Sequence, residues 1–476
     1  MTHPLQPLPR DTRKAAPPAT EFIEQSLYAK HIKIYPRKVH GFFADLRVIL
    51  ASITLGIFYG LPWLNWGAHR QAFLIDLPAH KFNLFAWTFW PEDLFYLAVI
   101  LMISALALFL FTAVAGRVWC GFACPQTVWT EIFMWMERKI EGDRMQQMKL
   151  AQQPWNRERI FRYSAKHALW LLFALWTGFT FVGFFTPIRE LALSMVNFSL
   201  GPWETFWVFF YAFATYGNAG WLRERVCTDM CPYARFQGAM FDRDTLIISY
   251  DSARGEPRGA RNRSADLKQE NLGDCISCTL CVQVCPTGID IRDGLQHQCI
   301  ACAACVDVCD SVMDHMGYAR GLIRYTTENA LAGKPSRVLR PRVVIYSMVL
   351  IAVTVALLAA VLLRVPLKVD VVRDRNSLYR ETNAGMIENV YTLKIMNRDQ
   401  ARHTYALSAD GIDGLRLDSD AELSLDAGGT REVVVRLVAD PAKLTQRSTK
   451  VVFAVHAADD KKIALHEDAR FLGPQP

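Results

Sequence analysis

Five long apolar runs divide the chain, at 48–63, 94–115, 168–185, 205–222 and 343–363. Most of them approach the roughly 20 residues that a helix needs to cross a bilayer, and the first is the shortest. Tryptophan side chains gather at or near the edges of the runs, where the two faces of a membrane would lie. The pattern predicts a multidomain membrane protein built on a bundle of five transmembrane helices.

In the last part of the chain the pattern changes to short runs rich in β-branched residues, at 390–395, 433–438 and 451–455. Turn-forming residues separate these runs, as expected for antiparallel strands. About 110 residues with this pattern are typical of a β-sandwich with an immunoglobulin-like fold, here without the cysteines of antibody domains. No constellation of catalytic side chains is visible there, so we interpret this part as a module that binds a partner or acts as a spacer.

Lysine and arginine are unevenly distributed among the loops between the apolar runs. The loop at 116–167 is rich in both, whereas the loops before and after it hold only Arg70, Lys81 and Arg189. Because basic loops stay inside the cell, we expect the N-terminus, this loop and the segment before the last run to be cytoplasmic. Five crossings of a bacterial inner membrane then place the C-terminal module in the periplasm. A formal net charge of +7 fits such loops, and no long basic face indicates a nucleic-acid partner.

The segment between the fourth and fifth apolar runs contains two cysteine runs, each with the spacing C-x2-C-x2-C-x3-C. In bacterial ferredoxins with this spacing, three cysteines of a run bind one [4Fe–4S] cluster and the fourth binds the other. A zinc ribbon uses two separated C-x2-C pairs and fits the sequence less well. We therefore predict two [4Fe–4S] clusters, one bound by Cys275, Cys278, Cys281 and Cys309 and the other by Cys299, Cys302, Cys305 and Cys285.

The remaining four of the twelve cysteines form a motif, C-x3-C-P, that occurs twice. Cys120 and Cys124 follow the second apolar run, and Cys227 and Cys231 follow the fourth. Each pair comes shortly after an Arg-Val dipeptide, which suggests duplication of a helical hairpin together with its motif. We expect the two pairs to face one another at the cytoplasmic surface of the membrane.

The proline of each motif predicts that Cys124 and Cys231 lie near helix N-termini, because proline is favoured in the first turn. A helix N-terminus lowers the pKa of a thiol and so favours the thiolate. Four thiolates, with Met230 as a further candidate ligand, would make a soft site suited to Cu(I) or to a reversible dithiol. The alternatives are cysteines that serve packing alone and a structural zinc site. We favour the metal or redox role, because chance does not readily produce two equivalent pairs.

The apolar runs lack the residues that several other membrane functions need. None contains histidine, which argues against a haem held by two histidines. None contains Asp, Glu, Lys or Arg, which argues against a proton relay or an ion pump. We interpret the basic segment at 252–268 as lying near anionic lipid, with docking of an electron donor as the alternative.

Together these features resemble the CcoG family of cytochrome c oxidase accessory proteins, also called FixG or RdxA. The resemblance covers most of the chain. It includes R-V-W-C-G-F-A-C-P-Q at 117–126 with its C-x3-C-P partner, Y-D-S-A-R-G-E-P-R-G at 250–259, the ferredoxin runs and the β-rich tail. We expect a cytoplasmic tail, a membrane domain with four transmembrane helices, a cytoplasmic ferredoxin-like domain, a fifth helix and a periplasmic immunoglobulin-like domain, at 1–42, 43–250, 251–342, 343–364 and 365–476.

The resemblance implies a membrane-bound cupric reductase that serves assembly of a cbb-type haem–copper oxidase. It makes Cys120, Cys124, Cys227 and Cys231 the catalytic residues, with copper as substrate or bound ion. The implied partners are a cytoplasmic electron donor, a copper exporter or chaperone and oxidase assembly factors, and homo-oligomerisation is left open. One alternative is a quinol-oxidising electron relay, as in membrane subunits related to nitrate and nitrous oxide reduction. The other is a non-enzymatic assembly scaffold.

Overall fold

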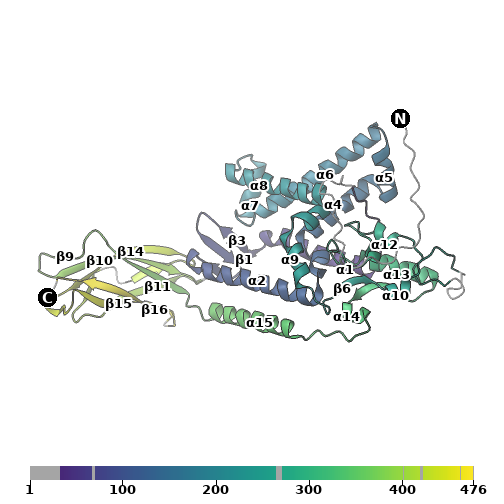
Figure 1. The fold of residues 1–476 in the computed structure, drawn as a ribbon. Coiled ribbons are helices and arrows are strands. Elements are labelled where there is room, and N and C mark those ends of the chain that lie inside the picture. Colours follow the sequence, from purple (N-terminus) through teal and green to yellow (C-terminus); the bar gives the residue numbers. More distant parts are fainter. Residues whose placement is uncertain are drawn as a thin grey trace.

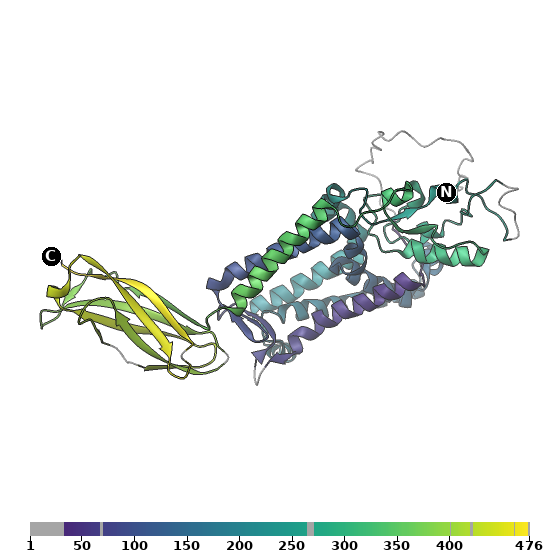
Figure 2. The ribbon, with the colours of Figure 1, turned by 90° about the horizontal axis from the view of Figure 1, so that it is seen from below.

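The computed structural model describes residues 33–66, 70–263, 271–399, 401–418, 422–460 and 462–474. Residues 1–32, most of the predicted cytoplasmic tail, lie outside the described residues. The described parts form three regions along one long axis (Figure 1, Figure 2). A β-sandwich lies at one end, long helices lie in the middle and the cysteine-rich segment lies at the other end.

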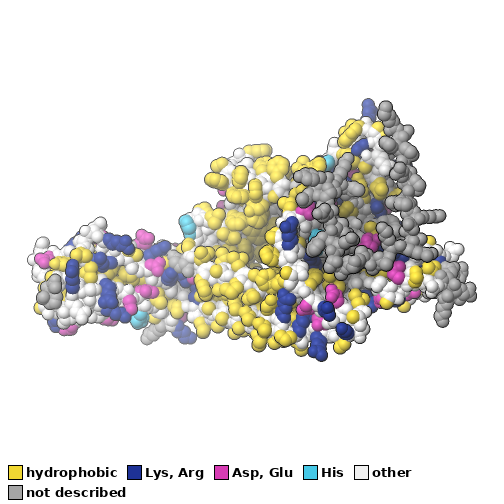
Figure 3. All heavy atoms as spheres, viewed as in Figure 1, with side chains coloured by type: hydrophobic (Ala, Val, Ile, Leu, Met, Phe, Trp, Pro, Cys, Tyr) yellow, Lys and Arg dark blue, Asp and Glu magenta, His cyan; other side chains and the backbone are white. Residues whose placement is uncertain are grey.

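Within the described residues, four helices are long and apolar enough to cross a membrane. They are α1 (Phe42–Gly60, continued to Trp63 by a short 3-10 turn), α2 (Leu94–Ala115), α6 (Arg157–Val182) and α15 (Pro341–Leu362). α2 and α15 pack side by side (Figure 1, Figure 2). Hydrophobic side chains cover this middle region, and charged side chains gather toward the two ends (Figure 3). Such a broad exposed apolar belt is what a bilayer covers, so the chain is a membrane protein.

The apolar run at 205–222 differs from the single long α-helix that the sequence predicts. α8 (Pro202–Thr215) spans 14 residues, and a π-helical segment, η3 (Tyr216–Leu222), continues it. Glycine disfavours the α-helix, and η3 contains two glycines. One of them, Gly220, lets a tryptophan approach closely, since an added Cβ would lie 3.2 Å from the ring of Trp170. The count of five transmembrane helices therefore stays a prediction.

α6 begins at Arg157, well before the apolar run at 168–185. Asn156 caps this start by accepting a hydrogen bond from the backbone N–H of Arg159 at 2.7 Å. The added half of the helix is polar, so hydropathy did not reveal it. It packs against α4 (Pro125–Glu141) and buries the charged side chain of Lys166.

Shorter elements connect the long helices. Two small antiparallel sheets lie between α1 and α2: β1 (Asn65–Trp66) with β2 (Arg70–Gln71), and β3 (Phe73–Asp76), β4 (Lys81–Leu84) and β5 (Trp87–Phe89). The other helices of this region are α3 (Val118–Phe122), α5 (Arg144–Gln152), α7 (Ile188–Val196), the π-helix η4 (Val226–Met230) and α9 (Pro232–Met240).

The cysteine-rich segment is closed by an antiparallel pair of strands, β6 (Ile247–Tyr250) and β7 (Ile323–Thr326). One buried carboxylate fastens this segment to the membrane helices. Asp307 accepts hydrogen bonds from the backbone N–H groups of Phe43 at 3.1 Å and Ala44 at 2.7 Å, and so caps the start of α1. The helices of the segment are α10 (Ser252–Gly255), α12 (Leu280–Gln283), α13 (Ala304–Met316) and α14 (Glu328–Leu331).

The C-terminal part is a sandwich of two antiparallel sheets, in the orders β12-β14-β10-β8, with β9 beside β10, and β13-β11-β15-β16. The predicted strands at 390–395, 433–438 and 451–455 fall in β10, β14 and β15 and are confirmed. Inward-facing side chains such as Tyr391 and Phe453 form the core. The strands are β8 (Leu367–Arg373), β9 (Arg380–Glu381), β10 (Ile387–Asn397), β11 (His403–Asp410), β12 (Arg416–Asp418), β13 (Glu422–Leu425), β14 (Thr430–Ala439), β15 (Ser448–Ala457) and β16 (Ala464–Leu472).

The sandwich is joined to the helices by a buried carboxylate between two arginines. Asp93, the N-cap of α2, lies 2.8 Å from Nη2 of Arg364 and 3.1 Å from Nη1 of Arg398. Arg364 follows α15 and Arg398 follows β10. Lys81 adds a hydrogen bond of 2.8 Å to the carbonyl oxygen of Gly428. These contacts come from both regions, so the sandwich docks against the helices.

His403 gives the sandwich a pH-dependent contact. Its Nδ1 lies 2.7 Å from Asp459 and its Nε2 lies 2.9 Å from Asp399. Burial alone would lower the pKa of His403, but the two carboxylates raise it above the ordinary 6.5. A histidine whose pKa is higher in the folded than in the unfolded protein stabilises the fold while it is protonated. This stabilisation is complete at pH values below the unfolded pKa, and it is lost as the pH rises through the folded pKa.

We therefore expect the separately expressed domain 365–476 to unfold at a higher temperature near pH 6 than near pH 8, with pH values chosen around the roughly 6.5 of free histidine. His403→Gln should remove most of this difference, because glutamine carries no titrating charge. Calorimetry of both proteins across the range checks it. A wild-type unfolding temperature that rises with pH, or the same slope in the variant, would contradict the assignment to His403.

Candidate iron–sulfur and thiol site

The two cysteine loops share an unusual backbone. Ser277 and Thr279 have φ of 55° and 56°, and Ala301 and Ala303, at the equivalent positions of the second loop, have φ of 53° and 58°. Non-glycine residues adopt this left-handed conformation rarely and at a cost in free energy. Alternating conformations of this kind turn successive backbone N–H groups toward one side, forming a concavity that binds anionic groups such as iron–sulfur clusters. The loops thus fit the cofactor that the spacing predicts.

Each loop lines a hollow together with the fourth cysteine of the other loop. We name the cysteines of one hollow the outer cysteine group: Cys275, Cys278, Cys281 and Cys309. Those of the other form the inner cysteine group: Cys285, Cys299, Cys302 and Cys305, with Cys281 also touching that hollow. Four cysteines around one hollow suit a [4Fe–4S] cluster. The structure brings together the two sets of four that the spacing predicts, and ligation by these sets stays a prediction.

The second cysteine of each C-x3-C-P motif lies where a helix begins, as predicted. Cys124 is the N-cap residue of α4, with Pro125 in its first turn. Cys231 is the N-cap residue of α9, with Pro232 in its first turn. We refer to Cys120, Cys124, Cys227 and Cys231 together as the thiol site.

The two motifs are fastened to one another. The sulfur of Cys120 lies 3.6 Å from Nε2 of Gln237, a fully buried residue of α9. In return, Gln126, at the start of α4, donates hydrogen bonds to the carbonyl oxygens of Asn218 at 2.9 Å and Arg223 at 3.2 Å. Each motif therefore binds the helical segment that carries the other, as expected for a duplicated unit.

Burial controls the protonation of the thiol site. It raises the pKa of Cys120 to about 11, although the hydrogen bond from Gln237 acts in the opposite direction. It raises the pKa of Cys227 to about 12, where the neighbouring thiols add to the effect. Burial also raises the pKa of Cys124, despite backbone N–H groups at the start of α4. The prediction that the helix N-terminus leaves Cys124 with a lowered pKa is therefore wrong, because the cost of burying the charged thiolate is larger.

Met230, the other predicted ligand, is placed differently from the thiols. Its side chain is 59% exposed, whereas the four thiols are half-buried. In the described parts of the chain, no group of three or more His, Cys, Asp or Glu side chains converges tightly enough to hold a single metal ion. The thiol site therefore consists of two adjoining pairs of cysteines in this arrangement.

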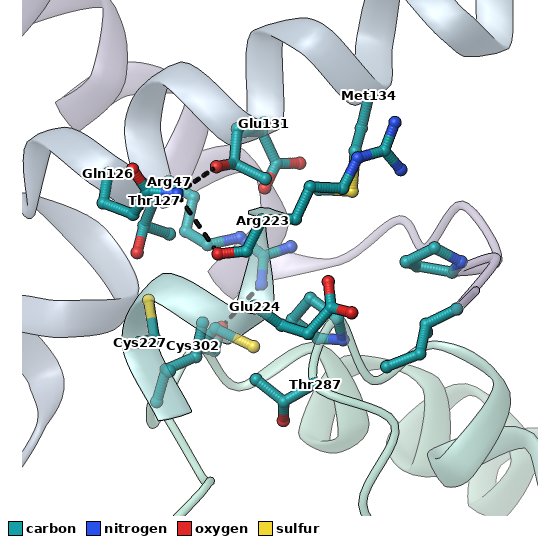
Figure 4. Close-up of a pocket in the computed structure, with 15 residues that line it drawn as sticks. Arg47, Gln126, Thr127, Glu131, Met134, Arg223, Glu224, Cys227, Thr287 and Cys302 are labelled. Carbon is teal, nitrogen blue, oxygen red and sulfur yellow. Dashed lines mark hydrogen bonds between the residues drawn. The ribbon is translucent and has the colours of Figure 1, made fainter. Parts of the chain in front are cut away.

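The thiol site lies directly against the inner cysteine group. An added Cβ on Gly121 would lie 2.7 Å from Cα of Cys302 and 2.8 Å from the carbonyl oxygen of Ile300, so the two backbones are in contact. Cys120 and Cys227 also pack into the apolar cluster around Cys302. Cys227 and Cys302 line one cavity, where Arg47 donates a hydrogen bond of 2.7 Å to the carbonyl oxygen of Cys302 (Figure 4).

A buried ionic group beside this cavity was missed by sequence reasoning. Glu137 lies 2.7 Å from both Lys33 and Arg223 and 3.6 Å from Lys166, which lies 2.6 Å from Glu141. Burial would raise the pKa of Glu137, but Arg223 and Lys33 reverse this and hold it at about 2. In the sequence these residues resemble the ordinary charged residues of basic loops. Only the spacing of Glu137 and Glu141, which places both on one face of a helix, could have indicated the ionic group.

In the described part of the basic segment, at 252–263, two arginines bind the cysteine segment, and the position near anionic lipid stays a prediction. Arg254 pairs with Asp274 and donates hydrogen bonds to the carbonyl oxygens of Ala319 and Arg320. Arg261 donates one of 2.6 Å to the carbonyl oxygen of Gly273. These two arginines hold the cysteine segment together through one carboxylate and several carbonyl oxygens.

Comparison with known families assigns the chain. The 4Fe–4S dicluster domain family matches residues 222–328, and a 4Fe–4S binding domain family matches residues 97–142. The family of the immunoglobulin-like fold at the C-terminus of FixG matches residues 357–474. Protein RdxB of Cereibacter sphaeroides is 40% identical over 435 residues, which cover 89% of this chain and 89% of RdxB. The chain belongs to the FixG/RdxA family.

A second FixG/RdxA relative is similar over most of its length. Nitrogen fixation protein FixG of Rhizobium meliloti is 38% identical over 422 residues, covering 81% of this chain and 80% of that protein. A crystal structure of a FixG-related protein from Vibrio parahaemolyticus matches 22% of this chain and 95% of its own, at 29% identity and a TM-score of 0.21. Membership and the dicluster match make this chain an iron–sulfur electron-transfer protein of the membrane.

Proposed function

We propose that this FixG/RdxA protein reduces Cu(II) to Cu(I) at the thiol site and so supplies copper for assembly of a cbb-type oxidase. The observation that carries the proposal is the contact between the thiol site and the inner cysteine group at Gly121. A bound [4Fe–4S] cluster passes one electron at a time, which is the number that converts Cu(II) to Cu(I).

The side chains of the thiol site supply the selectivity. Sulfur ligands are soft and stabilise Cu(I) relative to Cu(II), so they favour the reduced ion. Because burial raises the pKa of Cys120 and Cys227, a metal ion must displace their protons on binding. Gln237 holds the sulfur of Cys120 in place through a contact of 3.6 Å.

The orientation follows from the same proposal. The cysteine segment and the β-sandwich lie at opposite ends of the long helices (Figure 2). With the cysteine segment in the cytoplasm, a cytoplasmic donor can reduce it, and the sandwich lies in the periplasm, where oxidase assembly factors and a copper chaperone would meet it. The basic loop at 116–167 supports this orientation.

Removal of two thiols tests the proposal. In the double variant Cys120→Ser, Cys227→Ser, we expect both clusters to assemble and to be reduced by dithionite. Stoichiometric Cu(II) should then fail to reoxidise them, because serine oxygens do not stabilise Cu(I) as thiolates do. The readouts are cluster absorbance and Cu(I) trapped by a chelator under anaerobic conditions. Reduction of Cu(II) at the wild-type rate would show that electrons leave the clusters without the thiol site.

A second candidate, oxidation of a quinol, is favoured by one cavity between α6 and α8. Aromatic side chains and one carboxylate, Glu204, line it. Glu204 and Tyr211, both on α8, line it, so helical rise places its lining roughly 15–25 Å from Leu222, and Cys227 lies beyond that residue. A quinol bound there would be remote from both cysteine groups. If a quinol analogue nevertheless reduces the clusters of the intact protein, and Cu(II) leaves them reduced, this candidate replaces the first.

A further inference from the structure

The thiol site contacts the two cysteine groups unequally. Gly121, between Cys120 and Cys124, touches the inner group through its backbone. The apolar cluster that contains Cys120 and Cys227 includes Cys302 and Cys305 of that group. Cys275 and Cys281 of the outer group lie in another cluster, with Ile323 of β7, which α3 reaches through Phe122 but to which no cysteine of the thiol site contributes.

A buried arginine ties the same two parts together. Arg117, 6% exposed, directly precedes α3. Its Nη1 donates hydrogen bonds to the carbonyl oxygens of His297 and Cys299, the latter at 3.4 Å. Its Nη2 donates to the carbonyl oxygen of Ala234 on α9. One side chain therefore joins both C-x3-C-P motifs to the loop of the inner group.

The outer group has an accessible side. Cys278 is exposed, whereas Cys275 and Cys281 are buried. Its neighbours Ser277 and Thr279 belong to the same left-handed loop. In the described structure a soluble molecule can therefore approach the outer group at Cys278 without passing the thiol site.

We infer that Gly121 and Arg117 couple the thiol site to the inner cysteine group alone, and that the outer group, through Cys278, receives electrons from a one-electron donor. This inference rests on the proposed electron-transfer function and adds an order to it. Gly121 is a positioning residue: any side chain there would separate the backbones of α3 and the loop of Cys302. Each electron that enters at the outer group and leaves at the thiol site reduces one Cu(II) to one Cu(I).

Gly121→Ala tests the coupling in the full-length protein. The three atoms nearest to the added Cβ would be backbone atoms of Cys302 and Ile300, at 2.7–2.8 Å, so the loop itself must move. In dithionite-reduced protein, we expect the electron paramagnetic resonance signal of the inner-group cluster to shift and the outer-group signal to stay unchanged. Cys278→Ser, which should remove the outer signal, identifies which is which. The matched control is Gly238→Ala on α9, where an added Cβ meets nothing within 4 Å, and both signals should stay as in the wild type.

A measurement on the wild type covers the case in which Gly121→Ala does not fold. Cd(II), a redox-inert ion that binds thiolates, is added stoichiometrically to the reduced protein. The inference expects the inner-group signal alone to shift, and the double variant Cys120→Ser, Cys227→Ser to abolish this shift. Equal shifts of both signals, a shift of the outer signal alone or no shift overturns it. Because Cd(II) is not reduced, a selective shift sustains the coupling even if Cu(II) reduction fails.

Discussion

Replacing Glu137 with alanine should destabilise the protein by about 3–5 kcal/mol, the cost typical of breaking a buried ion pair. Glu137 is 2% exposed and neutralises Arg223 and Lys166, whose side chains are 8% and 6% exposed. Without the carboxylate, Arg223 loses the ion pair of 2.7 Å that neutralises it in a place that water hardly reaches. Lys166 keeps its ion pair with Glu141 at 2.6 Å, so the loss falls mainly on Arg223.

Thermal unfolding of the detergent-solubilised protein measures the effect. Glu158→Ala is the matched control, because Glu158 is 57% exposed and pairs with Arg162 on the surface of α6, at 2.8 Å. Exposed pairs of this kind contribute about 0–1 kcal/mol. Similar losses in the two variants would mean that the buried ionic group does not hold α4, α6 and η3 together.

In the Cys285→Ser variant, we expect the cluster of the inner group to be lost, although Cys285 belongs to the first cysteine run. Cys309→Ser should likewise cost the cluster of the outer group, although Cys309 belongs to the second run. The reason is that each cysteine run is predicted to supply its fourth cysteine to the cluster of the other run. Each hollow is accordingly lined by three cysteines of one run and the fourth cysteine of the other. Each variant should lose about half of the bound iron, because each of the two clusters contains four iron atoms.

Electron paramagnetic resonance of the reduced variants, with iron analysis, decides between exchange and its absence. Cys299→Ser and Cys278→Ser serve as references, because each alters a cysteine whose group is the same under either arrangement. With exchange, Cys285→Ser matches Cys299→Ser. If it matches Cys278→Ser instead, each run closes its own cluster and the predicted ligand sets are wrong.

The sequence predicted the features that depend on local patterns. Ligand spacing in the cysteine runs placed all eight cysteines in two sets, and β-branched runs located β10, β14 and β15. Hydropathy located α2 at its observed bounds, because every residue of that helix is apolar or small enough to face lipid.

Features that depend on tertiary partners escaped prediction. Lys166 and Arg223 resemble the basic residues of cytoplasmic loops, and nothing near them in the sequence shows that Glu137 neutralises them. The run at 205–222 ends in a π-helix, on which Trp170 packs and to which Gln126 donates a hydrogen bond, and both residues are distant in sequence. The high pKa of Cys227 depends on burial by neighbouring elements, which a motif does not encode.

The salt bridge at Asp93 gives the two ends of the molecule a mechanical connection. Asp93 starts α2 and is held by arginines that follow α15 and β10. The far end of α2 leads, within a few residues, to Arg117 and the first cysteine of the thiol site. A partner protein that binds and displaces the sandwich therefore transmits force through a rigid helix. That force reaches the residues beside Cys120.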